Sequence, residues 1–169
     1  MARVILLCGK ICSGKTTYAS YLCKKYSAVL LSVDEVMLSI FGQHCADKHD
    51  EYAARTQAYL YQKSVELIHA GMDVILDWGF WSYSGREYAR AFYQSHHICC
   101  EFHYLDVDDQ TLQQHIQARN QSVLSGAIQA YYVDPPLAQK CNTRFETPDC
   151  DEIPIRVSAD LFDAKQDFG

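Results

Sequence analysis

The chain has 169 residues, of which 49% are hydrophobic and 21% charged, with a net charge of −6 and a pI near 5.6. This length predicts one domain, residues 1–169, and the acidic balance disfavours a broad nucleic-acid interface, which normally needs clustered Lys and Arg. The chain has no apolar run long enough to span a membrane and no secretory signal, so we expect a cytoplasmic protein without a membrane partner.

The first expected strand is the apolar run Val4–Cys8, which is typical of a strand buried on both faces. It leads into Gly9–Thr16, a complete match to GxxxxGK[ST], and a helix is predicted over Thr17–Tyr26. Strand, glycine loop and helix are the context in which this motif binds phosphates. We therefore expect nucleotide contacts from Gly9, Lys10, Ile11, Cys12, Ser13, Gly14, Lys15, Thr16 and Thr17.

Two side chains of this loop carry specific expectations. Lys15 would reach the β- and γ-phosphates of ATP and act in catalysis, and Thr16 would offer its hydroxyl to Mg²⁺. The alternative, a tight glycine turn with a surface lysine, is disfavoured because the motif is complete and correctly framed.

A second apolar run over residues 28–32 predicts a parallel strand, and Asp34 follows it at the carboxyl edge of the sheet, where open α/β sheets bind ligands. A carboxylate at this edge could accept a proton from a substrate hydroxyl. It could instead cap the short helix expected over Val36–Phe41. We favour the general base.

The middle of the chain alternates expected helices, over residues 48–70 and 82–95 and from residue 108 onward, with expected strands over 72–76 and 98–105. Asp77 follows the third strand, so we expect it to hold Mg²⁺ or a water of that ion, with helix capping as the alternative. Trp78, Phe80 and Trp81 come next, and the sequence leaves open whether they form core or the wall of an acceptor pocket.

The pattern changes after Arg119. Residues 120–132 lack periodicity, which predicts a mobile excursion, whereas Asp134 followed by proline predicts a helix that runs to Phe145. We expect residues 119–146 to form a lid. Arg119 and Arg144 could each fold over the triphosphate as a catalytic group, and helix C-terminal capping is the alternative for both.

The remaining expectations concern the end of the chain, the other arginines and the cysteines. A last strand is predicted over residues 153–157, near the sheet edge because of Pro154, followed by a helix or tail over 158–168. We expect the other arginines, Arg55, Arg86 and Arg90, to lie on solvated helix faces or in intramolecular ion pairs. Arg55 and Arg86 are the better candidates for a contact with the substrate. The eight cysteines predict free thiols, and a zinc site at Cys99 and Cys100 is disfavoured.

The chain resembles small P-loop kinases of the AAA-family ATPase type, a group similar to chloramphenicol phosphotransferase, zeta toxin and polynucleotide kinase domains. The segments that carry the resemblance are Gly9–Thr17, Leu31–Glu35, Val74–Asp77, Phe102–Val107, Arg119–Asn120 and Arg144–Asp149. The resemblance implies a three-layer α/β/α P-loop kinase fold, with a mainly parallel sheet of about five strands and a helical lid. It also implies that Asp34 is the base, that Arg119 is a lid arginine and that residues 145–149 lie near the adenine.

Two departures from the polynucleotide kinases concern the acceptor. Met37 stands where those enzymes have an arginine, and Asp77-Trp78-Gly79-Phe80 replaces a polar Asp-Ala-Thr-Asn. Both departures favour a less charged, partly apolar acceptor over a nucleic-acid 5′ end.

The first functional hypothesis is therefore an ATP- and Mg²⁺-dependent kinase that phosphorylates a hydroxyl of a small molecule. The alternatives are a nucleoside or polynucleotide 5′-kinase and an ATP-controlled binding module with little turnover. A GTPase is disfavoured because the chain has no NKxD signature, and an AAA+ motor because the chain has no room for a separate helical lid domain. The sequence leaves the acceptor and the oligomeric state open.

Overall fold

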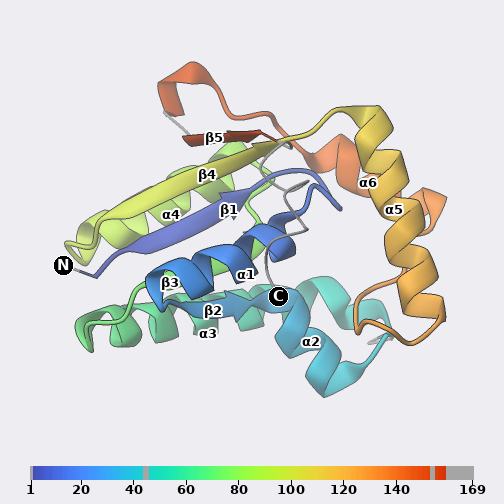
Figure 1. Cartoon of the computed structure of the whole chain (residues 1–169). Helices are drawn as coiled ribbons and strands as arrows, with labels where there is room; N and C mark the ends of the chain where they lie inside the picture. The colour runs from blue at the N-terminus through green and yellow to red at the C-terminus, as the bar shows by residue number, and fades with distance from the viewer. Residues whose placement is uncertain (1, 44–45, 153–154, 159–169) are drawn as a thin grey trace.

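The computed structural model describes residues 2–43, 46–152 and 155–158. Five parallel strands form one sheet in the order β2-β3-β1-β4-β5 (Figure 1). The strands are β1 (Val4–Cys8), β2 (Val29–Ser32), β3 (Val74–Gly79), β4 (Cys100–Asp106) and β5 (Ile155–Ser158). The expected α/β fold with a parallel sheet of about five strands is confirmed, and the last strand lies at an edge of the sheet.

Six α-helices and two short 3₁₀ helices connect these strands in the described part of the chain. They are α1 (Lys15–Tyr26), α2 (Val33–Phe41), η1 (Ala46–Lys48), α3 (His49–His69), α4 (Tyr83–Ser95), α5 (Asp109–Leu124), α6 (Pro135–Arg144) and η2 (Cys150–Glu152). Side-chain caps begin α4 and α6: the side chain of Ser82 accepts a hydrogen bond from Gly85 N, and that of Asp134 accepts one from Leu137 N. Among these residues no helix is long and apolar enough to cross a membrane.

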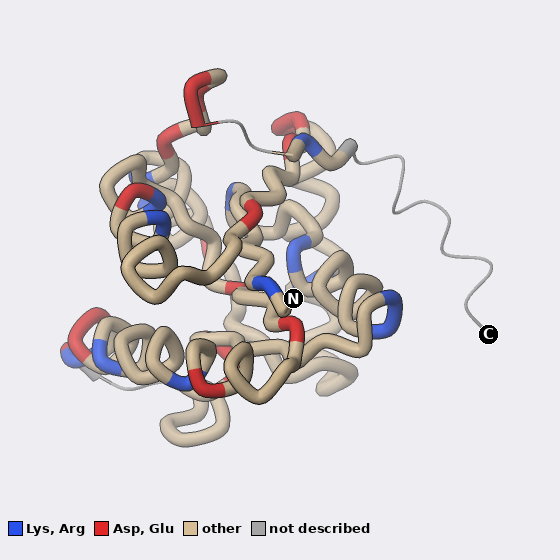
Figure 2. Tube along the Cα trace, turned by 90° about the vertical axis from the view of Figure 1, so that its left-hand side faces the viewer, with Lys and Arg blue, Asp and Glu red and all other residues tan. Residues whose placement is uncertain are grey.

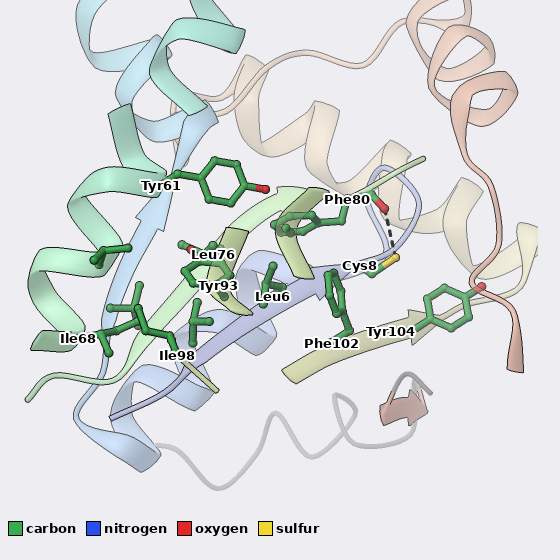
Figure 3. Close-up of a cluster of buried hydrophobic side chains, with 14 residues drawn as sticks. Leu6, Cys8, Tyr61, Ile68, Leu76, Phe80, Tyr93, Ile98, Phe102 and Tyr104 are labelled. Carbon is green, nitrogen blue, oxygen red and sulfur yellow. Dashed lines mark hydrogen bonds between the residues drawn. The ribbon is translucent and has the colours of Figure 1, made fainter. Parts of the chain in front are cut away.

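The sheet is the middle of three layers, because alternate residues of β1 face opposite helices. Ile5 and Leu7 pack with the buried residues of α1. Val4, Leu6 and Cys8 face the other way, toward α3 and α4. Figure 3 shows this second cluster, in which Leu6 lies among aromatic rings and the Cys8 thiol donates to the Phe80 carbonyl at 3.5 Å.

Three element boundaries differ from the sequence expectations. Helix α1 begins at Lys15, inside the glycine motif and two residues earlier than expected. Helix α2 begins at Val33, because the Ser32 side chain accepts a hydrogen bond from Glu35 N and so caps the helix three residues before the expected start. Strand β3 continues to Gly79, so Asp77 is part of the strand. All three differences lie at the carboxyl edge of the sheet, where the candidate site is found.

The expectation of a mobile excursion over residues 120–132 is wrong for its first part, because α5 extends to Leu124. The Asn120 side chain also holds the returning chain: its amide donates to Val133 O at 2.8 Å, and its carbonyl accepts from Val133 N at 2.9 Å. Helices α5 and α6 both lie beyond the carboxyl edge of the sheet (Figure 1). The last part of the expected final strand is present as β5, and the expectations for Pro154 and for residues 159–168 lie outside the described residues.

A buried ion pair fastens the segment that precedes β5 to the body of the domain. The Arg86 side chain is 1% exposed and donates to both carboxylate oxygens of Glu152, at 2.6 and 2.9 Å. Arg86 also donates to the carbonyls of Phe80 and Glu146, and Arg90 donates to the Glu152 carbonyl at 3.1 Å. The intramolecular pairs expected for Arg86 and Arg90 are therefore present.

Candidate nucleotide and acceptor site

The glycine motif forms a loop whose backbone can surround an anion. Gly14 is the N-cap of α1 with φ of 91°, and Cys12 has φ of 59°, so both adopt left-handed conformations. The Lys15 ammonium lies within the loop and donates to the carbonyls of Gly9 and Lys10, at 3.0 and 2.6 Å. Burial lowers the pKa of this ammonium, while the negative charge of Asp77 opposes the shift.

Thr16 and Asp77 meet at the start of α1. The Thr16 hydroxyl donates to Asp77 Oδ2 at 2.9 Å, and Asp77 is 7% exposed. A hydroxyl and a carboxylate are the hard oxygen donors that Mg²⁺ prefers. Thr16 and Asp77 are therefore suited to be the expected Mg²⁺ ligands. Their hydrogen bond connects the start of α1, which follows β1, with β3, to which Asp77 belongs.

Asp34 lies in the first turn of α2, two residues after the strand position that pairs with Asp77 in the sheet. Asp34 is exposed to solvent. Desolvation raises the pKa of this carboxyl, and the charge of Asp77 adds to the effect, whereas Arg119 and Lys15 oppose it. A carboxylate with a raised pKa is better matched to accepting a proton near neutral pH.

Arg119 and Arg144 occupy different settings. Arg119 lies within α5, five residues before its end, so the alternative of C-terminal capping does not apply. Its Nε donates to Tyr131 O at 3.1 Å, which leaves its terminal nitrogens directed to other partners, including Cys12 Sγ at 4.0 Å. Arg144 is the last residue of α6 and forms a loose ion pair with Asp50 at 3.8 Å.

One cleft of about 1570 Å³ brings the expected residues together. Its lining includes most of the glycine motif, both expected Mg²⁺ ligands, the expected base and both candidate arginines: Ile11, Cys12, Ser13, Gly14, Lys15, Thr16, Thr17, Asp34, Asp77, Arg119 and Arg144. Gly9 and Lys10 are not part of the lining. Their carbonyls hold Lys15 instead, and the Lys10 side chain pairs with Asp109 at 2.7 Å.

The three aromatic residues after Asp77 separate into two roles. Phe80 is 4% exposed and packs into the core, whereas Trp78 and Trp81 line the cleft. Gly79 makes this possible: its φ is 87°, and a Cβ on it would collide with the indole ring of Trp81. The interpretation as a pocket wall is thus consistent with the positions of the two tryptophans, and the core interpretation holds for Phe80.

The geometry does not support two expectations: a substrate contact by Arg55 or Arg86, and a position near the adenine for residues 145–149. Arg86 is buried in its pair with Glu152 and is not available to a substrate, and Arg55 is exposed beside Glu51 at 3.6 Å and does not line the cleft. Residues 145–149, expected near the adenine, are likewise absent from the cleft lining. Phe145 instead packs into the core beside Tyr104, at a ring centroid distance of 6.1 Å.

Sequence reasoning missed several cleft residues that come from α3 and α5. His49, Asp50 and Gln57 line the cleft from α3, and His115 approaches the glycine loop with Nδ1 3.0 Å from Cys12 O. These residues belong to no motif. Their only sequence signal was helical spacing, which does not say which face of a helix meets the site.

The cysteines are free thiols at every described position, as expected. Burial raises the pKa of Cys8 to about 11 and also raises the pKa of Cys12 in the loop. Within residues 2–43, 46–152 and 155–158 no cluster of three or more His, Cys, Asp and Glu suited to a metal ion is found.

Fold and site together define a P-loop nucleotide-binding domain. A family model described as an AAA domain matches residues 4–131, and the chain belongs to that family. The chain also has the fold of P-loop kinases, which confirms the resemblance drawn from the sequence. No curated protein matches the chain.

Three solved structures illustrate the similarity of fold. The Mycobacterium tuberculosis APS kinase CysC, solved with AMPPNP and APS, is 17% identical with a TM-score of 0.65, and the match covers 94% of this chain and 89% of that chain. A gluconokinase from Sinorhizobium meliloti 1021 is 14% identical with a TM-score of 0.64, covering 92% and 82%. A chain of the Pnkp1/Rnl/Hen1 RNA repair complex is 20% identical with a TM-score of 0.68, covering 85% of this chain and 43% of that one.

Proposed function

We propose that the protein is an ATP- and Mg²⁺-dependent phosphotransferase that moves the γ-phosphoryl group to a hydroxyl of a small molecule. The observation that carries the proposal is one cleft lined by residues 11–16 of the glycine motif, by Asp77 and by Asp34. Phosphoryl transfer needs positioning, charge neutralisation and a group that orients the nucleophile, and these residues can supply all three.

In this mechanism each residue has one task. Lys15 would exchange the loop carbonyls for the β- and γ-phosphates, and Thr16 and Asp77 would hold Mg²⁺, which when bound would neutralise charge on the phosphate oxygens. Asp34 accepts the proton of the acceptor hydroxyl while the oxygen of that hydroxyl bonds to the γ-phosphorus and the bond to ADP breaks. Arg119 supplies positive charge to the transferred group.

The size of the acceptor is the next part of the proposal. The similar structures include kinases of small molecules, APS kinase and a gluconokinase, and also a component of an RNA repair complex. Two features favour a small molecule for this chain: the net charge of −6, and Met37, a buried residue where polynucleotide kinases have an arginine. In Figure 2 basic and acidic residues are interspersed along the trace, which also favours a small acceptor over a long anionic strand.

A second candidate function is a nucleoside or polynucleotide 5′-kinase, favoured by the likeness to the RNA repair complex. It predicts binding to an oligonucleotide that weakens steeply with salt, because phosphate contacts release counterions. A third candidate, an ATP-controlled binding module, predicts ATP binding without transfer.

The experiment is a mass-spectrometric screen of pooled metabolites, nucleosides and short oligonucleotides incubated with ATP and Mg²⁺. Lys15→Ala and Asp34→Asn proteins are run beside the natural chain. The proposal expects a product heavier by one phosphoryl group from a small-molecule pool, and expects both variants to lose it. A product from the oligonucleotide pool alone favours the second candidate, and ATP binding without any product contradicts phosphotransfer.

A further inference from the structure

A second, smaller cavity adjoins the cleft. It measures about 470 Å³, and this side cavity shares Gln57, Trp78, Trp81 and Arg144 with the cleft. The other residues that line the side cavity are Phe80, Ser82, Gly85, Thr143 and Glu146. Because four residues line both spaces, one ligand can extend from the cleft into the side cavity.

Both tryptophans of the chain, Trp78 and Trp81, line the cleft and the side cavity. Successive residues of a strand face opposite sides of the sheet, so Trp78 faces away from Asp77. Trp78 packs edge to face on Tyr61, with ring centroids 5.2 Å apart. The Trp81 indole lies against Gly79, since a Cβ at Gly79 would collide with it. Two indole rings are thus fixed at the end of β3.

The polar side chains of the side cavity differ in how far they are already engaged. Glu146 accepts a hydrogen bond from Tyr83 N at 2.5 Å, and the Ser82 hydroxyl accepts one from Gly85 N. In the described part of the chain the Gln57 side chain has no hydrogen-bond partner, and Arg144 has only its ion pair with Asp50 at 3.8 Å. An amide and a guanidinium therefore retain donors beside two indole rings.

We infer that the side cavity holds the part of the acceptor remote from the reacting hydroxyl, and that this part is a sugar ring. A sugar ring has an apolar C–H face that packs on an indole and a rim of hydroxyls that pair with an amide and a guanidinium. A wholly apolar ring would leave the Gln57 amide desolvated and unpaired. This inference rests on the proposed transfer only for placing the reacting hydroxyl beside Asp34.

Binding can be followed without turnover, because both tryptophans of the chain line the side cavity. We would titrate the full chain, saturated with Mg²⁺ and AMPPNP, with glucose, glucosamine, ribose, glycerol and uridine, and record tryptophan fluorescence. The inference expects a saturable change with at least one of the three sugars and none with glycerol, which lacks a ring. Trp78→Phe and Trp81→Phe proteins assign the signal to one ring or the other.

A matched pair of variants tests the location. Thr143→Phe fills the side cavity from α6, and Asn142→Phe places the same ring on the exposed neighbouring position, which lines neither space. We expect the dissociation constant of the responding sugar to rise at least about tenfold in Thr143→Phe and to stay within about twofold in Asn142→Phe. Gln57→Ala should weaken the same sugar.

Three binding results would overturn the inference: no saturable response to any sugar, a response to uridine alone, or an unchanged dissociation constant in a folded Thr143→Phe protein. Failure of the proposed function is recognised separately. A sugar that binds at the side cavity but receives no phosphoryl group leaves the inference standing and contradicts phosphotransfer. Transfer to an acceptor that lacks a ring supports phosphotransfer and contradicts the inference.

Discussion

Two arginine–carboxylate arrangements in this domain show opposite uses of the same chemistry. Arg86 and Glu152 are buried together, and their polar atoms are satisfied by each other and by backbone carbonyls. Asp34 and Arg119 line a cleft of about 1570 Å³. Arg119 donates to the Tyr131 carbonyl and, at 4.0 Å, to Cys12 Sγ, and the Asp34 side chain has no hydrogen bond within the described residues. Arg86 and Glu152, whose polar side-chain atoms are all paired, stabilise the fold. Asp34 and Arg119 keep hydrogen-bonding groups that a ligand can use.

The largest expected effect is on the open side of this comparison. Arg119→Ala should lower the rate of phosphoryl transfer by about 10³- to 10⁵-fold, because the charge facing the transferred group is lost. Rates under saturating ATP and acceptor measure this. Arg55→Ala, which removes an exposed arginine outside the cleft, is the control and should leave the rate unchanged. A loss below about tenfold in Arg119→Ala would show that another group neutralises the phosphoryl charge.

On the closed side, Glu152→Ala should lower the free energy of unfolding by about 3–5 kcal/mol, because it leaves a buried guanidinium without its partner. Urea unfolding measures this. Glu51→Ala removes the exposed partner of Arg55 and should cost no more than about 0.5 kcal/mol. If Glu152→Ala and Glu51→Ala lower the free energy of unfolding equally, the buried Arg86–Glu152 pair does not stabilise the fold more than an exposed pair does.

The pH dependence of stability sharpens the same comparison. Burial raises the pKa of Glu152, but hydrogen bonds from Arg86 and from the backbone outweigh it, so the folded pKa lies below the ordinary value. Its contribution to stability is therefore present above the unfolded pKa and is lost as pH falls through the folded pKa. Urea titrations across the acid range should show this loss in the natural chain and a smaller one in Glu152→Gln.

The smallest expected effect concerns the contacts between α3 and α6. Lys140 and Arg144 each lie 3.8 Å from Asp50 Oδ2, and all three side chains are at least half exposed. Asp50→Ala should change the free energy of unfolding by less than about 1 kcal/mol, because water and salt screen such pairs. Urea unfolding at low and high salt checks this, and a loss above about 2 kcal/mol would identify these contacts as structural.

The parts of the site that the sequence predicted are those encoded by neighbouring residues. The glycine motif, its flanking strand and the helix after it span residues 4–26, and strand ends place Asp34 and Asp77 at one edge because parallel strands share it. Hydrophobic patterns and local caps such as Asp134 likewise predicted the elements to within a few residues. Local chemistry was sufficient for these features.

The missed features depend on residues far apart in sequence. The partner of Arg86 lies 66 residues away at Glu152, and no local pattern selects it over other acids. Helix α5 extends past Arg119 to Leu124, and Asn120 is tied to Val133 across the turn that follows; periodicity reveals neither feature. The place of Trp81 follows from the missing side chain of Gly79, a steric fact that needs the folded backbone.

The central claim is that the cleft separates nucleotide binding, by the glycine loop, from proton transfer, by Asp34. The most direct test measures both quantities on Asp34→Asn: the affinity for Mg²⁺–ATP and the rate of transfer to the acceptor that the screen identifies. The account predicts an ATP affinity within about threefold of the natural chain and a transfer rate lower by about 10²- to 10⁴-fold. Transfer at the natural rate by Asp34→Asn would contradict it.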